Sequence, residues 1–126
     1  MISKKAVVAM AFVDHYTGSL RSNPLPNETM REEIGHAVDH LAGNASSNNK
    51  KFVRNYRREA SAIKDAEERR ALDYLLAHEA AADETFAAIF VMLHGGHSNR
   101  EFEVLVKSRF AKSIGSVQKI VEGLKS

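Results

Sequence analysis

The chain has 126 residues, and 44% of them are hydrophobic, which is enough to build the core of one ordinary domain. Its 18 Lys and Arg nearly balance its 16 Asp and Glu, so the formal net charge of +2 identifies no partner by itself. The chain contains no Cys, which excludes disulfides, thiolate catalysis and Cys-based zinc sites and fits a cytoplasmic protein.

The first predicted helix covers residues 2–16, where apolar side chains occupy nearly the whole circumference instead of one stripe. Such a helix is either deeply buried or covers a second surface, which makes it the candidate interface of a homo-oligomer. Two prolines and two asparagines in residues 19–27 then predict a linker. No apolar stretch reaches the roughly 20 residues that cross a bilayer, so we expect no membrane span.

The second predicted helix covers residues 28–42 and ends at Gly43. Its apolar face is formed by Met30, Ile34, Val38 and Leu41. His36 and His40 are four residues apart, a spacing that can direct two imidazoles toward one metal ion. Both lie well away from the apolar face, which favours solvated surface histidines. They are the weak metal candidates of a chain for which we expect no metal and no other cofactor.

The third predicted helix covers residues 49–64 and follows a polar loop, residues 43–49. Its apolar face includes Phe52, Tyr56 and Ile63, and its opposite face is strongly basic. The cations of that face are Lys50, Lys51, Arg54, Arg57, Arg58 and Lys64.

This basic face is the densest surface signal in the sequence, and it has two interpretations. It can bind phosphates, an acidic protein surface or an anionic membrane surface. Alternatively, it is the ordinary solvated face of a helix, with Asp65, Glu67 and Glu68 available to pair with some of its cations.

Residues 66–94 contain no Gly and no Pro and are rich in helix-forming residues, so they predict one long central helix. Asp65, followed three residues later by Glu68, resembles a capping box and predicts a break from the preceding helix. One continuous helix through both segments is the alternative. The apolar stripe of the central helix consists of Leu72, Leu75, Leu76, Ala82, Phe86, Ile89, Phe90 and Leu93.

Two carboxylates, Glu79 and Asp83, fall inside that apolar stripe. An ionised carboxylate is costly to bury unless it is paired or hydrogen-bonded. We therefore expect a satisfied polar network beside them, a flared helix end that reaches water, or a ligand pocket with Tyr56, Tyr16 or a histidine as a further member. These are the ligand-pocket candidates.

The last predicted helix covers residues 99–124, after the pair Gly95 and Gly96. Ser98 and Glu101 have the spacing of a capping box at its start. Apolar residues then recur every three or four positions, which is typical of a bundle seam.

Several enzyme classes are disfavoured by the motifs and patterns that the sequence lacks. It has no phosphate-binding loop, dinucleotide Gly fingerprint, nucleophile elbow or HExxH, and strand-like alternation is missing. The sequence therefore predicts an all-α, single-domain bundle of about five helices over residues 1–126, organised around the long central helix 66–94.

Three functional hypotheses follow from these patterns. The first is a small non-catalytic interaction or regulatory protein that binds an acidic protein or nucleic acid through the basic face of residues 50–64. The second is a ligand-binding or metal-binding bundle, including an enzyme, that uses Glu79 and Asp83. The third is a structural homo-oligomer that associates through its apolar first helix.

Overall fold

Every regular element in the described part of the chain is an α-helix, as the sequence predicts. The computed structural model describes residues 28–77 and 79–125, which contain eight helices and no strand. They are α2 (Glu28–Leu41), α3 (Ala45–Asn48), α4 (Lys50–Ala62), α5 (Ala66–Ala71), α6 (Asp73–Leu76), α7 (Ala81–Leu93), α8 (Arg100–Arg109) and α9 (Ala111–Lys125). The predicted helix 2–16 and the linker 19–27 lie outside the described residues.

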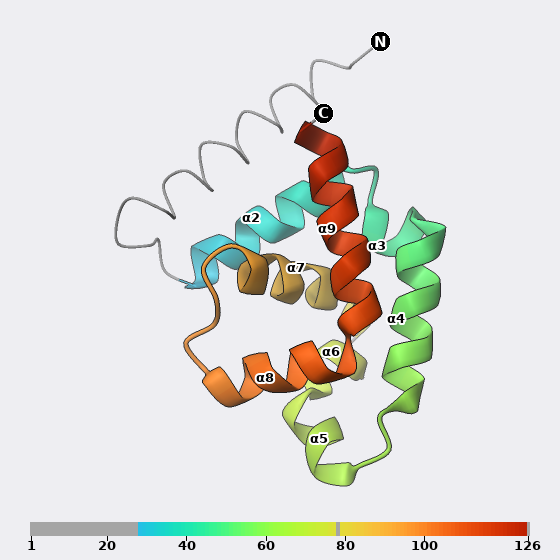
Figure 1. The fold of residues 1–126 in the computed structure, drawn as a ribbon, viewed down its shortest axis with the longest axis vertical. Coiled ribbons are helices and arrows are strands. Elements are labelled where there is room, and N and C mark those ends of the chain that lie inside the picture. Colours follow the sequence, from blue (N-terminus) through green and yellow to red (C-terminus); the bar gives the residue numbers. More distant parts are fainter. Residues whose placement is uncertain (1–27, 78, 126) are drawn as a thin grey trace.

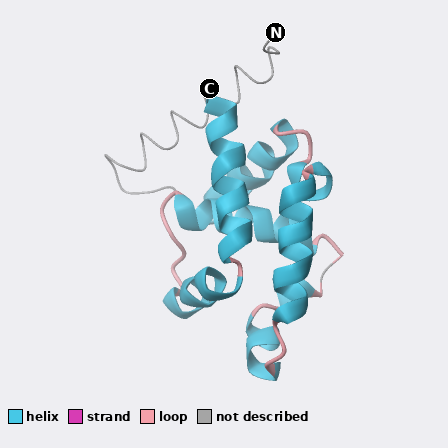
Figure 2. Cartoon of the chain, turned by 45° about the vertical axis from the view of Figure 1, so that its right-hand side comes forward, coloured by secondary structure: helices cyan, strands magenta, loops and turns pink. Residues whose placement is uncertain are grey.

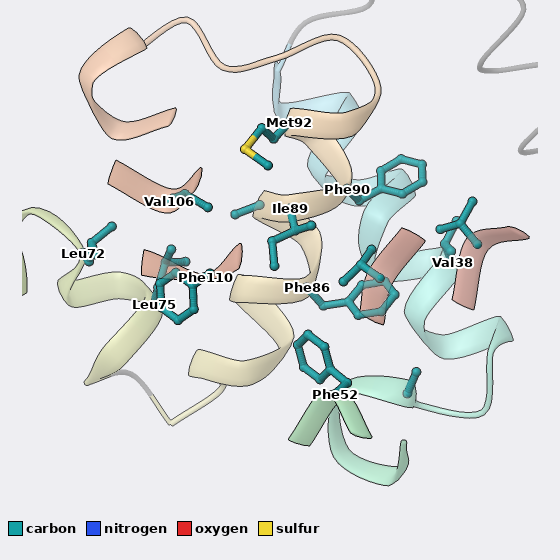
Figure 3. Close-up of a cluster of buried hydrophobic side chains, with 14 of the residues drawn as sticks. Val38, Phe52, Leu72, Leu75, Phe86, Ile89, Phe90, Met92, Val106 and Phe110 are labelled. Carbon is teal, nitrogen blue, oxygen red and sulfur yellow. The ribbon is translucent and has the colours of Figure 1, made fainter. Parts of the chain in front are cut away.

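Helix α7 is the centre of the bundle, and α2, α3, α6 and α9 all pack against it (Figure 1). Nine of its 13 residues are buried, which explains why it is apolar on nearly every side. Phe86, Ile89 and Phe90 project from it into a core that receives side chains from the surrounding helices (Figure 3). Phe52 of α4 meets Phe86 edge to face, with ring centroids 5.6 Å apart.

The contact between α2 and α7 is unusually close because a glycine lies at the crossing. The buried face of α2 consists of Arg31, Ile34, Gly35, Val38 and Asp39. A Cβ at Gly35 would lie only 3.0 Å from the Cα of Ala87 and 3.2 Å from the Cβ of Phe90. The buried face of α2 is therefore rotated about the helix axis from the apolar face that the sequence predicts. The rotation follows from the close backbone approach at Gly35, which turns that side of α2 toward α7.

The predicted continuous helix over residues 66–94 is wrong in detail, since this segment forms α5, α6 and α7. Breaks occur at Leu72 and between Leu76 and Ala81. A straight helix of that length would extend roughly 43 Å, well beyond the core of so small a protein. The breaks fold the segment so that Leu72, Leu75 and α7 all reach the same core.

The second break is stabilised by hydrogen-bond donors from two other helices, α4 and α7. The carbonyl oxygen of Leu75 has lost the helical partner it would have in a continuous helix. It instead accepts hydrogen bonds from the hydroxyl of Tyr56, at 2.6 Å, and from the hydroxyl of Thr85, at 3.2 Å. The break is therefore specified by tertiary contacts, in a stretch that lacks Gly and Pro.

The predicted last helix also divides, at Phe110, into α8 and α9. Glu59 of α4 accepts hydrogen bonds from the backbone N–H of Lys112, at 2.9 Å, and of Ser113, at 2.8 Å. It therefore caps the N–H groups that the break leaves free at the start of α9. One helix, α4, thus supplies the side chain that stabilises each of these two breaks.

Other helix boundaries follow local sequence signals. Asp65 accepts a hydrogen bond from the N–H of Glu68 at 3.0 Å, so the predicted break between residues 64 and 66 is confirmed. The capping residue of α8 is Asn99, one position after the predicted Ser98, and it accepts from the N–H of Phe102. Short helix α3 occupies part of the predicted loop 43–49.

Helix α4 lies on one flank of the molecule, where it packs beside α9 (Figures 1 and 2). At the end near α5, the carboxylate of Glu68 binds Arg109 of α8 in a two-pronged ion pair of 2.6 and 2.7 Å. Within the described residues, every helix is too short or too polar to cross a membrane.

Candidate anion-binding face of α4

Helix α4 is strongly two-sided, and its inner side holds it firmly in the bundle. Asn49 caps its first turn by accepting from the N–H of Phe52 at 3.0 Å. Phe52 is fully buried, and Tyr56 stacks between Phe52 and Phe110 with centroid distances of 6.2 and 6.1 Å. Together with the bonds of Tyr56 and Glu59, these contacts fix the direction in which the outer side points.

The outer side carries four cations around one shallow hollow of about 600 Å³. The hollow is lined by Ser47, Asn48, Lys50, Val53, Arg54, Arg57, Arg58 and Ser61. All four of its cations are exposed. We call this group of eight residues the basic hollow.

The other two predicted cations lie elsewhere. Lys51 and Lys119 of α9 line a neighbouring hollow of about 280 Å³. Repulsion from Lys119 lowers the pKa of Lys51 below its usual value. Lys64 is exposed in the turn beyond the end of α4 and does not line the basic hollow. The structure thus divides the six predicted cations into three parts. Four line the basic hollow, Lys51 lies beside Lys119 of α9, and Lys64 is separate.

Acidic neighbours do not neutralise these cations. Glu59 is engaged with the start of α9, Asp65 with the N–H of Glu68, and Glu68 with Arg109. In the described part of the chain, no carboxylate forms an ion pair with any of the six predicted cations. The pairing by Asp65, Glu67 or Glu68 that the sequence left open is therefore not found among the described residues.

The predicted carboxylate pocket is arranged differently from the expectation. Glu79 is exposed in the segment between α6 and α7, so its predicted place in the core stripe is wrong. The break before α7 removes it from the helical register that placed it there. Asp83 is half-buried and contacts the hydroxyl of Ser46, while the hydroxyl of Tyr56 donates to Leu75. The three candidates therefore have separate surroundings.

Among the residues whose burial the structure describes, the buried carboxylate is that of Asp39 of α2, which the sequence did not single out. It is only 5% exposed and accepts hydrogen bonds from the N–H of Ser46, at 2.8 Å, and from its hydroxyl, at 2.6 Å. Burial raises the pKa of Asp39, and the negative charge of Asp83 acts in the same direction. Gly35, one turn earlier, was the available signal that this side of α2 is buried.

The side chains of Asp39 and Asp83 both contact the hydroxyl of Ser46, and we call these three residues the Ser46 network. The Ser46 hydroxyl has a single proton, yet its Oγ contacts one carboxyl oxygen of Asp39 and one of Asp83. A hydroxyl with one proton can donate it to one carboxyl group or share it between both as a bifurcated hydrogen bond.

The two weak metal candidates have separate partners. The Nε2 atom of half-buried His36 lies 3.5 Å from Glu84, whereas Nδ1 of exposed His40 lies 3.1 Å from the side-chain oxygen of Asn44. Across residues 28–77 and 79–125, no three His, Asp or Glu side chains gather closely enough to hold a metal ion.

Comparisons with known proteins find no matching family model, no matching curated protein and no matching solved structure. The function of this chain must therefore be inferred from the chemistry of its own surface. The basic hollow, Lys119 and the Ser46 network are the features that the tertiary structure adds to the sequence pattern. The polar lining residues Ser47, Asn48 and Ser61 carry no charge or motif that would have marked them beforehand.

Proposed function

We propose that this protein is a small non-catalytic interaction protein that binds a polyanion, either nucleic acid or an acidic protein surface, through the basic hollow of α4. The observation that carries the proposal is that four exposed cations share one hollow without a carboxylate partner in the described part of the chain. Like charges gathered in this way repel one another, and a bound anion relieves that repulsion.

The rigid setting of α4 supports the same proposal. Its inner side is held by aromatic packing, and its Tyr56 and Glu59 side chains bind segments 19 and 54 residues away in the chain. The cations therefore project from a fixed helix, which reduces the conformational entropy lost when an anion binds. Three of the four are arginines, whose planar guanidinium groups bind phosphate or carboxylate with two parallel hydrogen bonds.

The test is retention on immobilised heparin, a sulfated polyanion, followed by elution with increasing salt. We expect the double variant Arg54→Glu/Arg57→Glu to elute at clearly lower salt than the wild-type protein. The matched control is Arg70→Glu/Arg100→Glu, which has the same net charge but alters exposed cations outside the hollow.

Equal elution of the two double variants would show that only net charge matters and would overturn the proposal. Failure of the wild-type protein to be retained at low salt would overturn it as well. Circular dichroism of both variants confirms that each remains helical, so that a difference in elution reports on the surface.

A further inference from the structure

The composition of the basic hollow distinguishes between the two kinds of polyanion. Its eight lining residues are four cations, three small polar residues and one apolar residue, Val53. The centre of a protein–protein interface is normally apolar and aromatic, with Lys depleted. Contacts to nucleic-acid phosphates come instead from Arg and Lys together with Ser and Asn, which is the mixture found here.

The position of the aromatic residues indicates which part of a nucleic acid would be contacted. Proteins that hold single strands commonly stack the bases on exposed aromatic side chains. Among the described residues that line the hollow, none is aromatic, and Phe52 and Tyr56 lie on the inner side of α4 in contact with the core. The hollow therefore offers hydrogen-bond donors for a backbone without a platform for bases.

The length of the face also fits a phosphate backbone. From Lys50 to Arg58, α4 rises roughly 12 Å, at about 1.5 Å per residue. One strand of a duplex presents a phosphate about every 3.4 Å along its axis, so a face of this length meets about four phosphates. Four phosphates match the four cations of the hollow. The outer flank position of α4 leaves this side of the molecule accessible (Figure 2).

We infer that the partner of the basic hollow is the phosphate backbone of a nucleic-acid duplex, bound without recognition of base sequence; this inference rests on the function proposed above. Arg54, Arg57 and Arg58 contact phosphate oxygens through their guanidinium groups, and Lys50 contributes a fourth charge. Ser47, Asn48 and Ser61 donate hydrogen bonds to the same backbone.

The experiment measures fluorescence anisotropy of two labelled 20-base-pair DNA duplexes of unrelated sequence over a series of salt concentrations. We expect equal affinities for the two duplexes and a slope of log K against log salt of about −3.6, which is about −0.9 for each of four phosphates. Arg54→Gln/Arg57→Gln should reduce the slope by about 2 and the affinity at 0.1 M salt by roughly 100-fold, about tenfold per contact. Arg70→Gln/Arg100→Gln should change neither quantity appreciably.

Two other polyanions separate this inference from the broader proposal. The same anisotropy assay is run with a labelled single strand and with a labelled glutamate-rich peptide that has the same number of charges as the duplex. Tighter binding of the peptide or of the single strand, or a large difference between the two duplex sequences, would overturn the duplex inference and leave polyanion binding standing. Absence of binding to both heparin and duplex would overturn both. The wild-type salt slope gives a readout that does not depend on the folding of any variant.

Discussion

Glu59 binds Ser113, 54 positions further along the chain, through both the backbone N–H at 2.8 Å and the hydroxyl at 2.7 Å. Glu59 lies on α4 next to Arg58, yet its carboxylate binds the buried Ser113 near the start of α9. This contact stabilises the break between α8 and α9, and it engages the Glu59 carboxylate with α9 instead of with a cation of the basic hollow.

Replacement of Glu59 by Ala should lower the free energy of unfolding by about 1–3 kcal/mol, because the buried N–H and hydroxyl of Ser113 lose their acceptor. Urea denaturation followed by circular dichroism measures the change. Glu67→Ala is the control, since Glu67 is exposed, and it should change stability by less than about 0.5 kcal/mol. Equal effects of the two substitutions would contradict the capping role.

Gly35→Ala should destabilise the protein by about 1–3 kcal/mol, because the new Cβ would lie 3.0 Å from the backbone of Ala87 and would separate α2 from α7. Gly115→Ala is the matched control. Gly115 lies within α9 and has open space where a Cβ would lie, so the same substitution should stabilise the protein by about 0.5–1 kcal/mol through helix propensity. Thermal unfolding of both variants should show midpoint shifts of opposite sign. Shifts of the same sign would contradict the close helix crossing.

The wild-type protein should lose part of its free energy of unfolding as pH rises from acidic values, and the substitution Asp39→Asn should make this loss smaller. The pKa of Asp39 is raised above its ordinary value by burial, so the folded protein holds this proton more tightly than the unfolded chain does. The resulting stabilisation is fully present below the ordinary carboxyl pKa and disappears as pH rises through the higher folded value. His36 acts in the opposite direction on this pKa, and Asp83 acts in the same direction.

The asparagine variant also fits the Ser46 network without an extra proton. Its carbonyl oxygen can accept from the Ser46 N–H, its amide can donate to Oγ, and the Ser46 hydroxyl is then free to donate to Asp83. Urea denaturation over a range of pH tests this, with exposed Asp73→Asn as the control. Unchanged pH dependence in the Asp39→Asn variant would contradict a raised pKa of Asp39 in the folded protein.

Lys119→Gln should raise the pKa of Lys51 toward its ordinary value. Repulsion between the two ammonium groups is the largest cause of the lowered pKa, and the substitution removes it. An NMR titration of the lysine side chains measures the shift, and Lys112→Gln on the same helix is the control. A Lys51 pKa that responds equally to both substitutions would place the repulsion elsewhere.

Much of the fold follows from local chemistry. The helical pattern, the cap at Asp65 and the stop at Gly43 each depend on residues within one turn of the boundary. Such features are present in the sequence itself, and the structure contains them where the pattern places them.

The breaks at residues 77–80 and at Phe110 differ in kind, because no residue near them opposes a helix strongly. They exist because Tyr56 and Glu59 bind the backbone groups that each break sets free, and both side chains come from a distant helix. The misplacement of Glu79 follows from the same cause, since a continuous helix was assumed through the first of these breaks.

The sequence by itself predicted the helical character that the described residues have, the apolar stripe from Leu72 to Leu93, and a basic face over residues 50–64. Only the tertiary structure decided where the helices break, which carboxylate is buried and which cations share a hollow. The physical reason is the range over which each interaction acts: helix propensity and capping act over about four residues, whereas burial, side-chain hydrogen bonding and charge repulsion depend on groups that the fold brings together from distant positions.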